Sequence, residues 1–191
     1  MPGNQNELLN PSRIWSRTEV FNQKPCPIPA ESGVYAWYFK HIPSIIPKQD
    51  CHQHNNFILL YVGIAPSRPT SSSNLRKRIK QHYRGNAYGS TLRLSLGCLL
   101  AEELDIELRC VGGGKRQTFG PGETKLSNWM EQNAFVTWTL QPEPGLLEDE
   151  LIQQLSLPLN LRSNENHPFH PQLTAIRSQA KTHAKELPVH K

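Results

Sequence analysis

The 191-residue sequence has no run of apolar residues near the roughly 18 that a membrane-spanning helix requires. Its first residues lack the charged and apolar regions of a signal peptide, so we expect a cytoplasmic protein without a membrane segment. The four cysteines show no CxxC spacing, which favours reduced thiols over a disulfide framework. Cys51, His52 and His54 are metal-ligand types, but without a distant ligand pair they predict a polar loop more strongly than a zinc site.

Acidic residues are missing from positions 74–93, although the same segment contains six lysines or arginines. The net charge of +5 is therefore concentrated there. If residues 75–83 form a helix, with about 100° of rotation per residue, Leu75 and Ile79 make an apolar stripe, and Arg78 and His82 lie along one edge. The pattern fits either an anionic partner such as a phosphodiester backbone or a solvated surface helix. Four cations of this segment would either bind the nucleic-acid backbone or remain as solvated surface charge, namely Arg76, Lys77, Lys80 and Arg84.

Residues 112–122 contain five glycines but lack the Gly-Lys-Ser/Thr ending of a phosphate-binding P-loop. We therefore reject nucleotide binding by this segment. We interpret it as a mobile basic loop, whose Lys115 and Arg116 would lie along a groove of nucleic acid.

Patterning divides the chain into a lead-in segment (1–31), a core domain (32–162) and a basic C-terminal arm (163–191). Apolar, β-branched and aromatic runs predict strands at 33–39, 57–62, 104–111 and 135–140. Helices are predicted at 123–133, 144–155 and 172–185, whereas residues 91–100 fit a helix or a strand. We expect the arm either to clamp nucleic acid or to cover the edge of the domain.

One carboxylate falls on the apolar side of the helix predicted at 144–155. Leu147, Leu151, Ile152 and Leu155 span an arc of about 140°, and Glu148 lies inside it. A carboxylate in that position is unfavourable unless it is paired, hydrogen-bonded or holding a metal. Glu148 is therefore a candidate functional acid, and the alternative is an acid at the border of the stripe that reaches solvent.

Five short motifs, taken in order, resemble those of the GIY-YIG nuclease superfamily. They are Gly33-Val34-Tyr35, Tyr61-Val62-Gly63, Arg78 with His82 four residues later, Glu148, and Asn160. The resemblance covers roughly residues 33–161 and implies an α/β fold with a small, mostly antiparallel central sheet flanked by helices. His82 stands where restriction-type members have His, and Ile64 stands where repair-type members have Lys, so the restriction-type branch is nearest in pattern.

The resemblance also implies a catalytic site, made of Tyr35, Tyr61, Arg78, His82, Glu148 and Asn160. Tyr35 would take a proton from the attacking water, provided that cations such as Arg78 favour the phenolate of a group with a pKa of roughly 10. Arg78 would bind the scissile phosphate through its planar guanidinium. Glu148 would hold one Mg²⁺ near the leaving 3′-oxygen, and Asn160 would fix the site by hydrogen bonds.

The function implied is Mg²⁺-dependent hydrolysis of phosphodiester bonds in DNA by an endonuclease of restriction or genome-defence type. The alternatives are a non-catalytic nucleic-acid-binding module on the same fold and a DNA repair or processing nuclease. Because a binding module needs only the cations, the presence of all five motifs favours the enzyme. A homodimer on the DNA would follow if both strands are cut.

Overall fold

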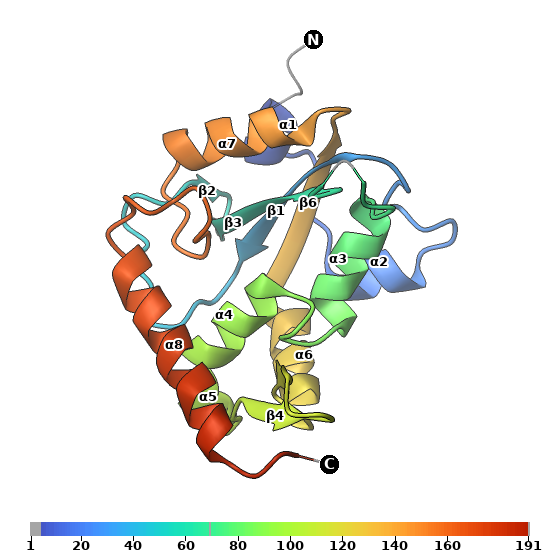
Figure 1. Ribbon diagram of the computed structural model, residues 1–191. Coiled ribbons are helices and arrows are strands. Elements are labelled where there is room, and N and C mark those ends of the chain that lie inside the picture. The colour runs from blue at the N-terminus through green and yellow to red at the C-terminus, as the bar shows by residue number, and fades with distance from the viewer. Residues whose placement is uncertain (1–4, 69, 191) are drawn as a thin grey trace.

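The structure is a computed structural model that describes residues 5–68 and 70–190. Its centre is an antiparallel sheet of four strands, shown in Figure 1. Their spatial order is β2 (Gln53–His54), β3 (Phe57–Ala65), β1 (Gly33–Phe39) and β6 (Ala134–Leu140). The predicted α/β class, with a small antiparallel sheet flanked by helices, is confirmed. The strand predicted at 57–62 is also confirmed, and it continues for three further residues.

Strand β1, one of the two inner strands, is buried on both of its faces. Because side chains alternate across a strand, Tyr35 and Trp37 enter one apolar core, whereas Val34 enters a second core on the opposite face. Helix α3 (Leu75–Arg84) contributes to the first core, and helix α7 (Pro144–Gln154) contributes to the second. The sheet therefore lies between these two helices, with one motif-bearing helix on each face (Figure 1).

The other helices surround this centre. They are α1 (Gln5–Leu9), α2 (Arg17–Asn22), α4 (Thr91–Leu99), α5 (Ala101–Leu104), α6 (Gly122–Asn133) and α8 (His170–Glu186). Helices α6, α7 and α8 confirm the three predicted from patterning, and the ambiguous segment 91–100 is the helix α4. Helix α8 packs along α4 (Figure 1). Among residues 5–68 and 70–190, no helix is both long and apolar enough to cross a bilayer.

The basic helix begins where the sequence predicts. Asn74 is its N-cap, and the side-chain oxygen of Asn74 accepts a hydrogen bond of 2.9 Å from the backbone N–H of Lys77. Leu75 and Ile79 are fully buried, so the predicted apolar stripe anchors the helix to the sheet. His82 is also fully buried, which removes one edge of the helix from solvent.

The lead-in packs against the sheet rather than forming a separate unit. Trp15 and Val136 exchange two backbone hydrogen bonds of 2.8 and 2.9 Å, which adds a short bridge beyond β6. Leu8 in α1 is fully buried, and its carbonyl oxygen accepts a 2.7 Å hydrogen bond from the Tyr38 hydroxyl. The lead-in therefore closes the edge of the sheet that β6 would otherwise expose.

The strand predicted at 104–111 is wrong over most of its length. Helix α5 ends at Leu104, Asp105 adopts a left-handed backbone with φ of 48°, and only β4 (Arg109–Val111) is extended. The predicted loop at 112–122 is also wrong in part, because β5 (Arg116–Thr118) lies within it and pairs with β4. Gly112 and Gly114, with φ of 59° and 82°, make the turn between these two strands.

Candidate active site

Five of the six predicted catalytic residues line one cleft, whose volume is about 370 Å³. The cleft is bordered by β1, β3, α3, α4, α7, the loop after α7, and α8. The predicted catalytic residues that line it are Tyr35, Tyr61, Arg78, Glu148 and Asn160. His82 lies behind Tyr35 and is absent from the lining. The structure thus brings together motifs that lie up to 125 positions apart in the sequence.

Gly63 leaves the space that the Tyr35 ring occupies. The two residues are direct partners in the antiparallel pairing of β1 with β3. A Cβ atom added at Gly63 would lie 2.5 Å from the Tyr35 hydroxyl oxygen and 2.7 Å from the ring carbon that carries it. Both distances are far shorter than a van der Waals contact, so a side chain here would displace the Tyr35 hydroxyl. The glycine of the second motif is therefore a steric requirement of the tyrosine of the first.

A chain of hydrogen bonds holds the Tyr35 hydroxyl in place. It lies 2.8 Å from Nε2 of His82, and Nδ1 of His82 lies 2.7 Å from the hydroxyl oxygen of Ser90. Ser90 is also the N-cap of α4, because its hydroxyl oxygen accepts a bond from the backbone N–H of Arg93. All four side chains are at most 1% exposed. The start of α4 thereby fixes the imidazole, and the imidazole fixes the phenol.

Burial keeps this histidine neutral. Desolvation, together with the positive charges of Arg78 and Arg93, lowers the pKa of His82 well below its usual value. A neutral imidazole carries one N–H and one lone pair, so it donates on one side and accepts on the other. His82 can therefore accept a hydrogen bond on one side and donate one on the other, and so it bridges Tyr35 and Ser90. It is fully buried and does not line the cleft.

Both site tyrosines resist ionisation. Burial raises the pKa of Tyr35 well above its usual value, the neighbouring Tyr61 raises it further, and the Arg78 cation opposes the rise. Burial also raises the pKa of Tyr61, whose hydroxyl lies 3.4 Å from the Thr91 hydroxyl. Arg78 thus favours a Tyr35 phenolate, as its charge predicts, but in the free protein desolvation outweighs this effect and the hydroxyl stays protonated.

Arg78 projects from α3 into the cleft and is held by the following loop. Its Nη1 donates a 2.9 Å hydrogen bond to the carbonyl oxygen of Gly89. Gly89 is itself fixed by a bond from its N–H to the Asn86 side chain. One side of the guanidinium is therefore used for positioning, and its remaining donors are available to an anion in the cleft.

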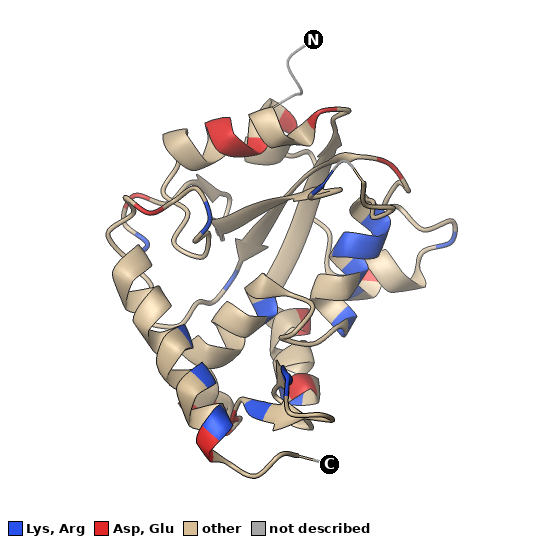
Figure 2. Ribbon diagram, viewed as in Figure 1, with Lys and Arg blue, Asp and Glu red and all other residues tan. Residues whose placement is uncertain are grey.

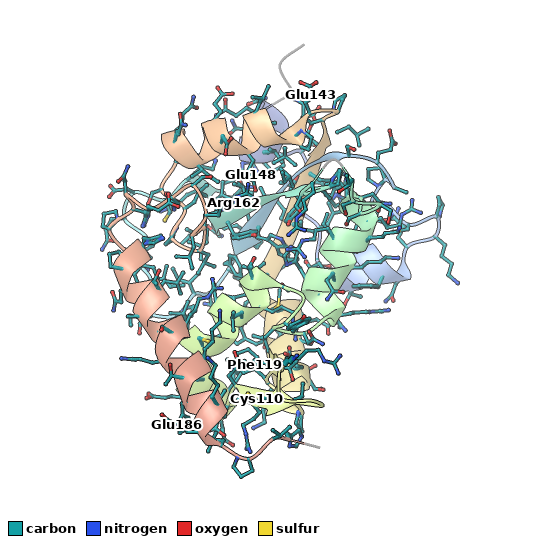
Figure 3. The ribbon with its side chains drawn as sticks, viewed as in Figure 1. Cys110, Phe119, Glu143, Glu148, Arg162 and Glu186 are labelled. Atoms are coloured by element: carbon teal, nitrogen blue, oxygen red, sulfur yellow. The ribbon has the colours of Figure 1, made fainter. Side chains whose placement is uncertain are left out.

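Glu148 reaches the cleft from the opposite side, on α7, with Arg162 of the next loop beside it (Figure 3). Burial raises the pKa of Glu148 to about 7, the neighbouring Asp149 adds to the rise, and Arg162 and Arg78 oppose it. Within the described part of the chain, no hydrogen bond or salt bridge joins the Glu148 carboxylate to a side chain. This carboxylate is half-buried and has the wheel position that the sequence predicts.

These residues fit a single Mg²⁺ ion better than a fully protein-made metal centre. No cluster of three or more His, Cys, Asp or Glu side chains with ligand geometry occurs among residues 5–68 and 70–190. Mg²⁺ commonly binds through one or two carboxylates, with water and substrate phosphate as the remaining ligands. An unpaired carboxylate facing a cleft meets that need. His52 is used elsewhere, because its Nε2 lies 2.7 Å from the Leu9 carbonyl oxygen.

Asn160 supports the sheet at the point where the cleft begins. Its side-chain oxygen accepts a bond from the N–H of Val62, and its side-chain nitrogen donates to the carbonyl oxygen of the same residue, both at 2.9 Å. The amide thus imitates a neighbouring strand along β3 and satisfies two buried backbone groups. The predicted contribution of Asn160 through hydrogen bonds has this physical form.

None of the six cations predicted to bind nucleic acid lines the cleft. Arg76 donates a 2.7 Å bond to a carbonyl of the lead-in, and the Arg84 guanidinium lies 3.5 Å from the centre of the Phe21 ring. Lys80 lies over the same ring, and the Lys77 ammonium donates to the carbonyl of Ser72. Figure 2 shows this cationic side of α3.

The hairpin cations occupy another part of the molecule. Lys115 and Arg116 are exposed in the β4–β5 hairpin, at the end of the molecule opposite α7 in Figure 1. Neither lines the cleft.

Sequence reasoning missed two cations that do line the cleft, Arg162 and Arg177. Arg162 lies in a loop, two positions after the Asn160 motif, and Arg177 lies in the C-terminal arm, for which the sequence leaves open a role in clamping nucleic acid. It also missed Ser90, although a serine directly before the apolar run 91–100 is a recognisable N-cap signal.

A family model described as the GIY-YIG catalytic domain matches residues 33–179. The match spans most of the chain and includes every residue of the cleft described above. Searches of curated proteins and of solved structures give no significant match.

Proposed function

The chain belongs to the GIY-YIG nuclease family, and on that premise we propose that it is a Mg²⁺-dependent endonuclease that hydrolyses phosphodiester bonds in DNA. The observation that supports this best is the cleft itself, where a tyrosine, an arginine and an unpaired carboxylate of the family motifs face one another. We also propose residues 32–162 as the nuclease domain, with residues 1–31 as its lead-in and 163–191 as a basic arm.

In the proposed reaction Arg78 binds the scissile phosphate with the donors that Gly89 leaves free, which neutralises charge that develops in the transition state. A water molecule on the Tyr35 side attacks phosphorus. It gives one proton to the Tyr35 oxygen as the phenol proton moves to Nε2 of His82, and the 3′-oxygen departs and takes a proton from solvent.

This relay avoids a free Tyr35 phenolate, which burial disfavours. The proton reaches the neutral imidazole of His82, whose orientation Ser90 sets. Burial and the charges of Arg78 and Arg93 disfavour the resulting imidazolium in the free protein, and the phosphate anion bound at Arg78 would offset that effect. His82 thus acts on Tyr35, whereas Tyr35 alone meets the reacting water.

The Glu148 carboxylate is the proposed ligand of one Mg²⁺ ion, which when bound would neutralise charge at the leaving oxygen. Asp149 is exposed and does not line the cleft, so Glu148 is the carboxylate of α7 to which we assign this role. Tyr61 and Asn160 complete the site by shaping its wall, Tyr61 beside Thr91 and Asn160 behind β3.

The restriction or genome-defence role is the branch that we favour within the family. Its support is the pairing of His82 with Tyr35, and the aliphatic Ile64 in the cleft wall at the position where repair-type members have lysine. A repair or processing nuclease remains the second candidate for the biological role, and a homodimer on DNA accompanies the restriction role if both strands are cut.

A supercoiled-plasmid assay separates the enzyme from a non-catalytic binding module. We expect nicked or linear DNA with Mg²⁺ and intact DNA with EDTA. Glu148→Ala should abolish cleavage and leave DNA binding in EDTA nearly unchanged. Full activity of Glu148→Ala would refute the metal assignment, and binding by the wild-type protein without any cleavage would favour the binding module.

A further inference from the structure

Arg177 reaches the active cleft from a part of the chain that carries no family motif. It lies in the middle of α8, the helix that packs along α4. Its side chain lines the same cleft as Tyr35, Arg78 and Glu148. The C-terminal arm therefore forms one wall of the catalytic cleft in addition to covering the edge of the domain.

The guanidinium of Arg177 is half-buried and has little to compensate its charge. Its Nη1 donates a 3.2 Å hydrogen bond to the hydroxyl oxygen of Ser95. In the described part of the chain, no carboxylate forms a salt bridge with it. Burial lowers its pKa, and the neighbouring Tyr61 and Cys98 act against that change. A partly desolvated cation without an anion is unfavourable, so the site is arranged for an anion from outside.

Arg93 on α4 is a buried arginine whose charge is compensated, in contrast to that of Arg177. Arg93 is fully buried, and its guanidinium forms a salt bridge of 2.6 Å with Glu123. Arg93 therefore has its counter-charge within the fold. Arg177 lies against the same helix and lacks such a partner, although it faces the cleft.

The excess of positive charge in the cleft also favours an anionic ligand. Its lining contains three guanidinium groups, those of Arg78, Arg162 and Arg177, against the single carboxylate of Glu148. Arg78 and Arg177 project into the cleft from different helices, α3 and α8, so the cations are distributed over more than one wall of the cleft. A nucleic-acid strand carries a phosphate at each nucleotide and supplies a second anion at a fixed interval from the first.

We propose that Arg177 binds a second, non-scissile phosphate of the same nucleic-acid strand, next to the phosphate that Arg78 holds. This inference rests on the proposed nuclease function. The ligand class is a phosphodiester backbone, recognised by charge and by the planar fork of the guanidinium and not by base identity. Arg177 thus fixes the register of the strand in the cleft.

The test compares Arg177→Ala with Lys185→Ala, which removes an exposed cation from the same helix. Binding of a fluorescent duplex is measured in EDTA over a series of salt concentrations. For Arg177→Ala we expect affinity to fall about tenfold or more. The slope of log affinity against log salt should fall by about 0.9, the value for one lost phosphate contact on duplex DNA. Lys185→Ala should change affinity by about twofold or less.

A second measurement places the contact in the cleft. Thymidine 3′,5′-bisphosphate should compete with the duplex better than thymidine 5′-monophosphate against the wild-type protein, and Arg177→Ala should remove that difference. Arg177→Lys, which keeps the charge and loses the fork, should keep the salt slope and recover part of the affinity. Circular dichroism and thermal unfolding confirm that each variant is folded.

An unchanged affinity and salt slope for Arg177→Ala would overturn the proposal, and so would a weaker affinity with an unchanged slope, because Arg177 would then act through packing. These readouts need no cleavage. A wild-type protein that binds DNA but never cuts it would contradict the nuclease function and leave the phosphate subsite intact, whereas one that cuts DNA with Arg177→Ala unimpaired would contradict the subsite alone.

Discussion

Replacement of Glu148 by glutamine should stabilise the fold at alkaline pH while it removes activity. Burial raises the pKa of Glu148 from 4.5 to about 7. Below pH 4.5 the carboxyl is protonated in the folded and the unfolded chain, so it costs nothing. As the pH rises towards 7 the unfolded chain releases the proton and the folded protein retains it, so stability falls, and above about 7 the loss is complete.

The size of the effect follows from the same numbers. At roughly 1.4 kcal/mol per pKa unit, the rise corresponds to about 3 kcal/mol of lost folding free energy at pH 8, which we take as an upper bound. Glutamine has nearly the same shape and no charge. Glu148→Gln should therefore exceed the wild-type protein in stability by up to about 3 kcal/mol at pH 8, with little difference near pH 4.5.

Urea unfolding in EDTA, followed by circular dichroism at several pH values, measures this difference. Glu150→Gln provides the matched control, since Glu150 lies on the exposed face of the same helix, and its effect should stay within about 0.5 kcal/mol. Addition of Mg²⁺ should stabilise the wild-type protein and leave Glu148→Gln unaffected. The idea of an uncompensated carboxylate would be refuted if Glu148→Gln were less stable than the wild type at pH 8. It would also be refuted if the difference in free energy of unfolding between the two proteins were the same at all pH values.

Three further variants test other parts of the site. Tyr35→Phe removes the group that accepts the proton from water, and single-turnover kinetics should show a loss of about 100-fold or more with DNA affinity preserved; a rate equal to wild type would exclude Tyr35 as the base. Gly63→Ala should displace the Tyr35 hydroxyl and cost about 100-fold in the same assay, although the protein remains folded. Asn160→Ala leaves two backbone groups of β3 without partners and should lower the free energy of unfolding by about 2–4 kcal/mol in a urea titration; a change below about 0.5 kcal/mol would mean that Asn160 does not support the sheet.

The elements that hold the motifs could be predicted because local and long-range preferences agree there. β1 and β3 are rich in apolar residues because both inner strands contribute side chains to the cores on the two faces of the sheet, and Asn74 marks the start of α3. The Glu148 hypothesis followed from a helical wheel, and the structure places this carboxylate in the cleft.

The wrong strand prediction at 104–111 shows that an alternating apolar pattern alone does not determine a strand. Ile106, Leu108 and Cys110 alternate and all are buried, as a strand would require. Burial of alternate residues does not supply a hydrogen-bonding partner, however. Only the last residues of the segment meet β5, because the left-handed turn at Asp105 directs the earlier ones into the core without a neighbouring strand.

The roles of the cations depend on three-dimensional packing in the same way. Arg76 and Arg84 stand in the densest run of positive charge, and yet their side chains are used against the lead-in. Arg177 lies 99 positions from Arg78 in a polar helix, and only the packing of α8 along α4 carries it to the cleft. Similarly, the balance between burial and Arg78 that sets the pKa of Tyr35 requires the folded surroundings.

The central claim is that this cleft hydrolyses phosphodiester bonds, and the most direct measurement compares the wild-type protein with Arg78→Ala and Lys77→Ala in Mg²⁺-dependent plasmid cleavage, with DNA affinity measured in parallel. Lys77 and Arg78 are adjacent residues of α3, but only Arg78 lines the cleft. We predict that the wild-type protein and Lys77→Ala cut the plasmid at similar rates. Arg78→Ala should lose cleavage far more than affinity, because only about tenfold in affinity is expected from one lost phosphate contact. Equal cleavage by all three proteins would contradict the account.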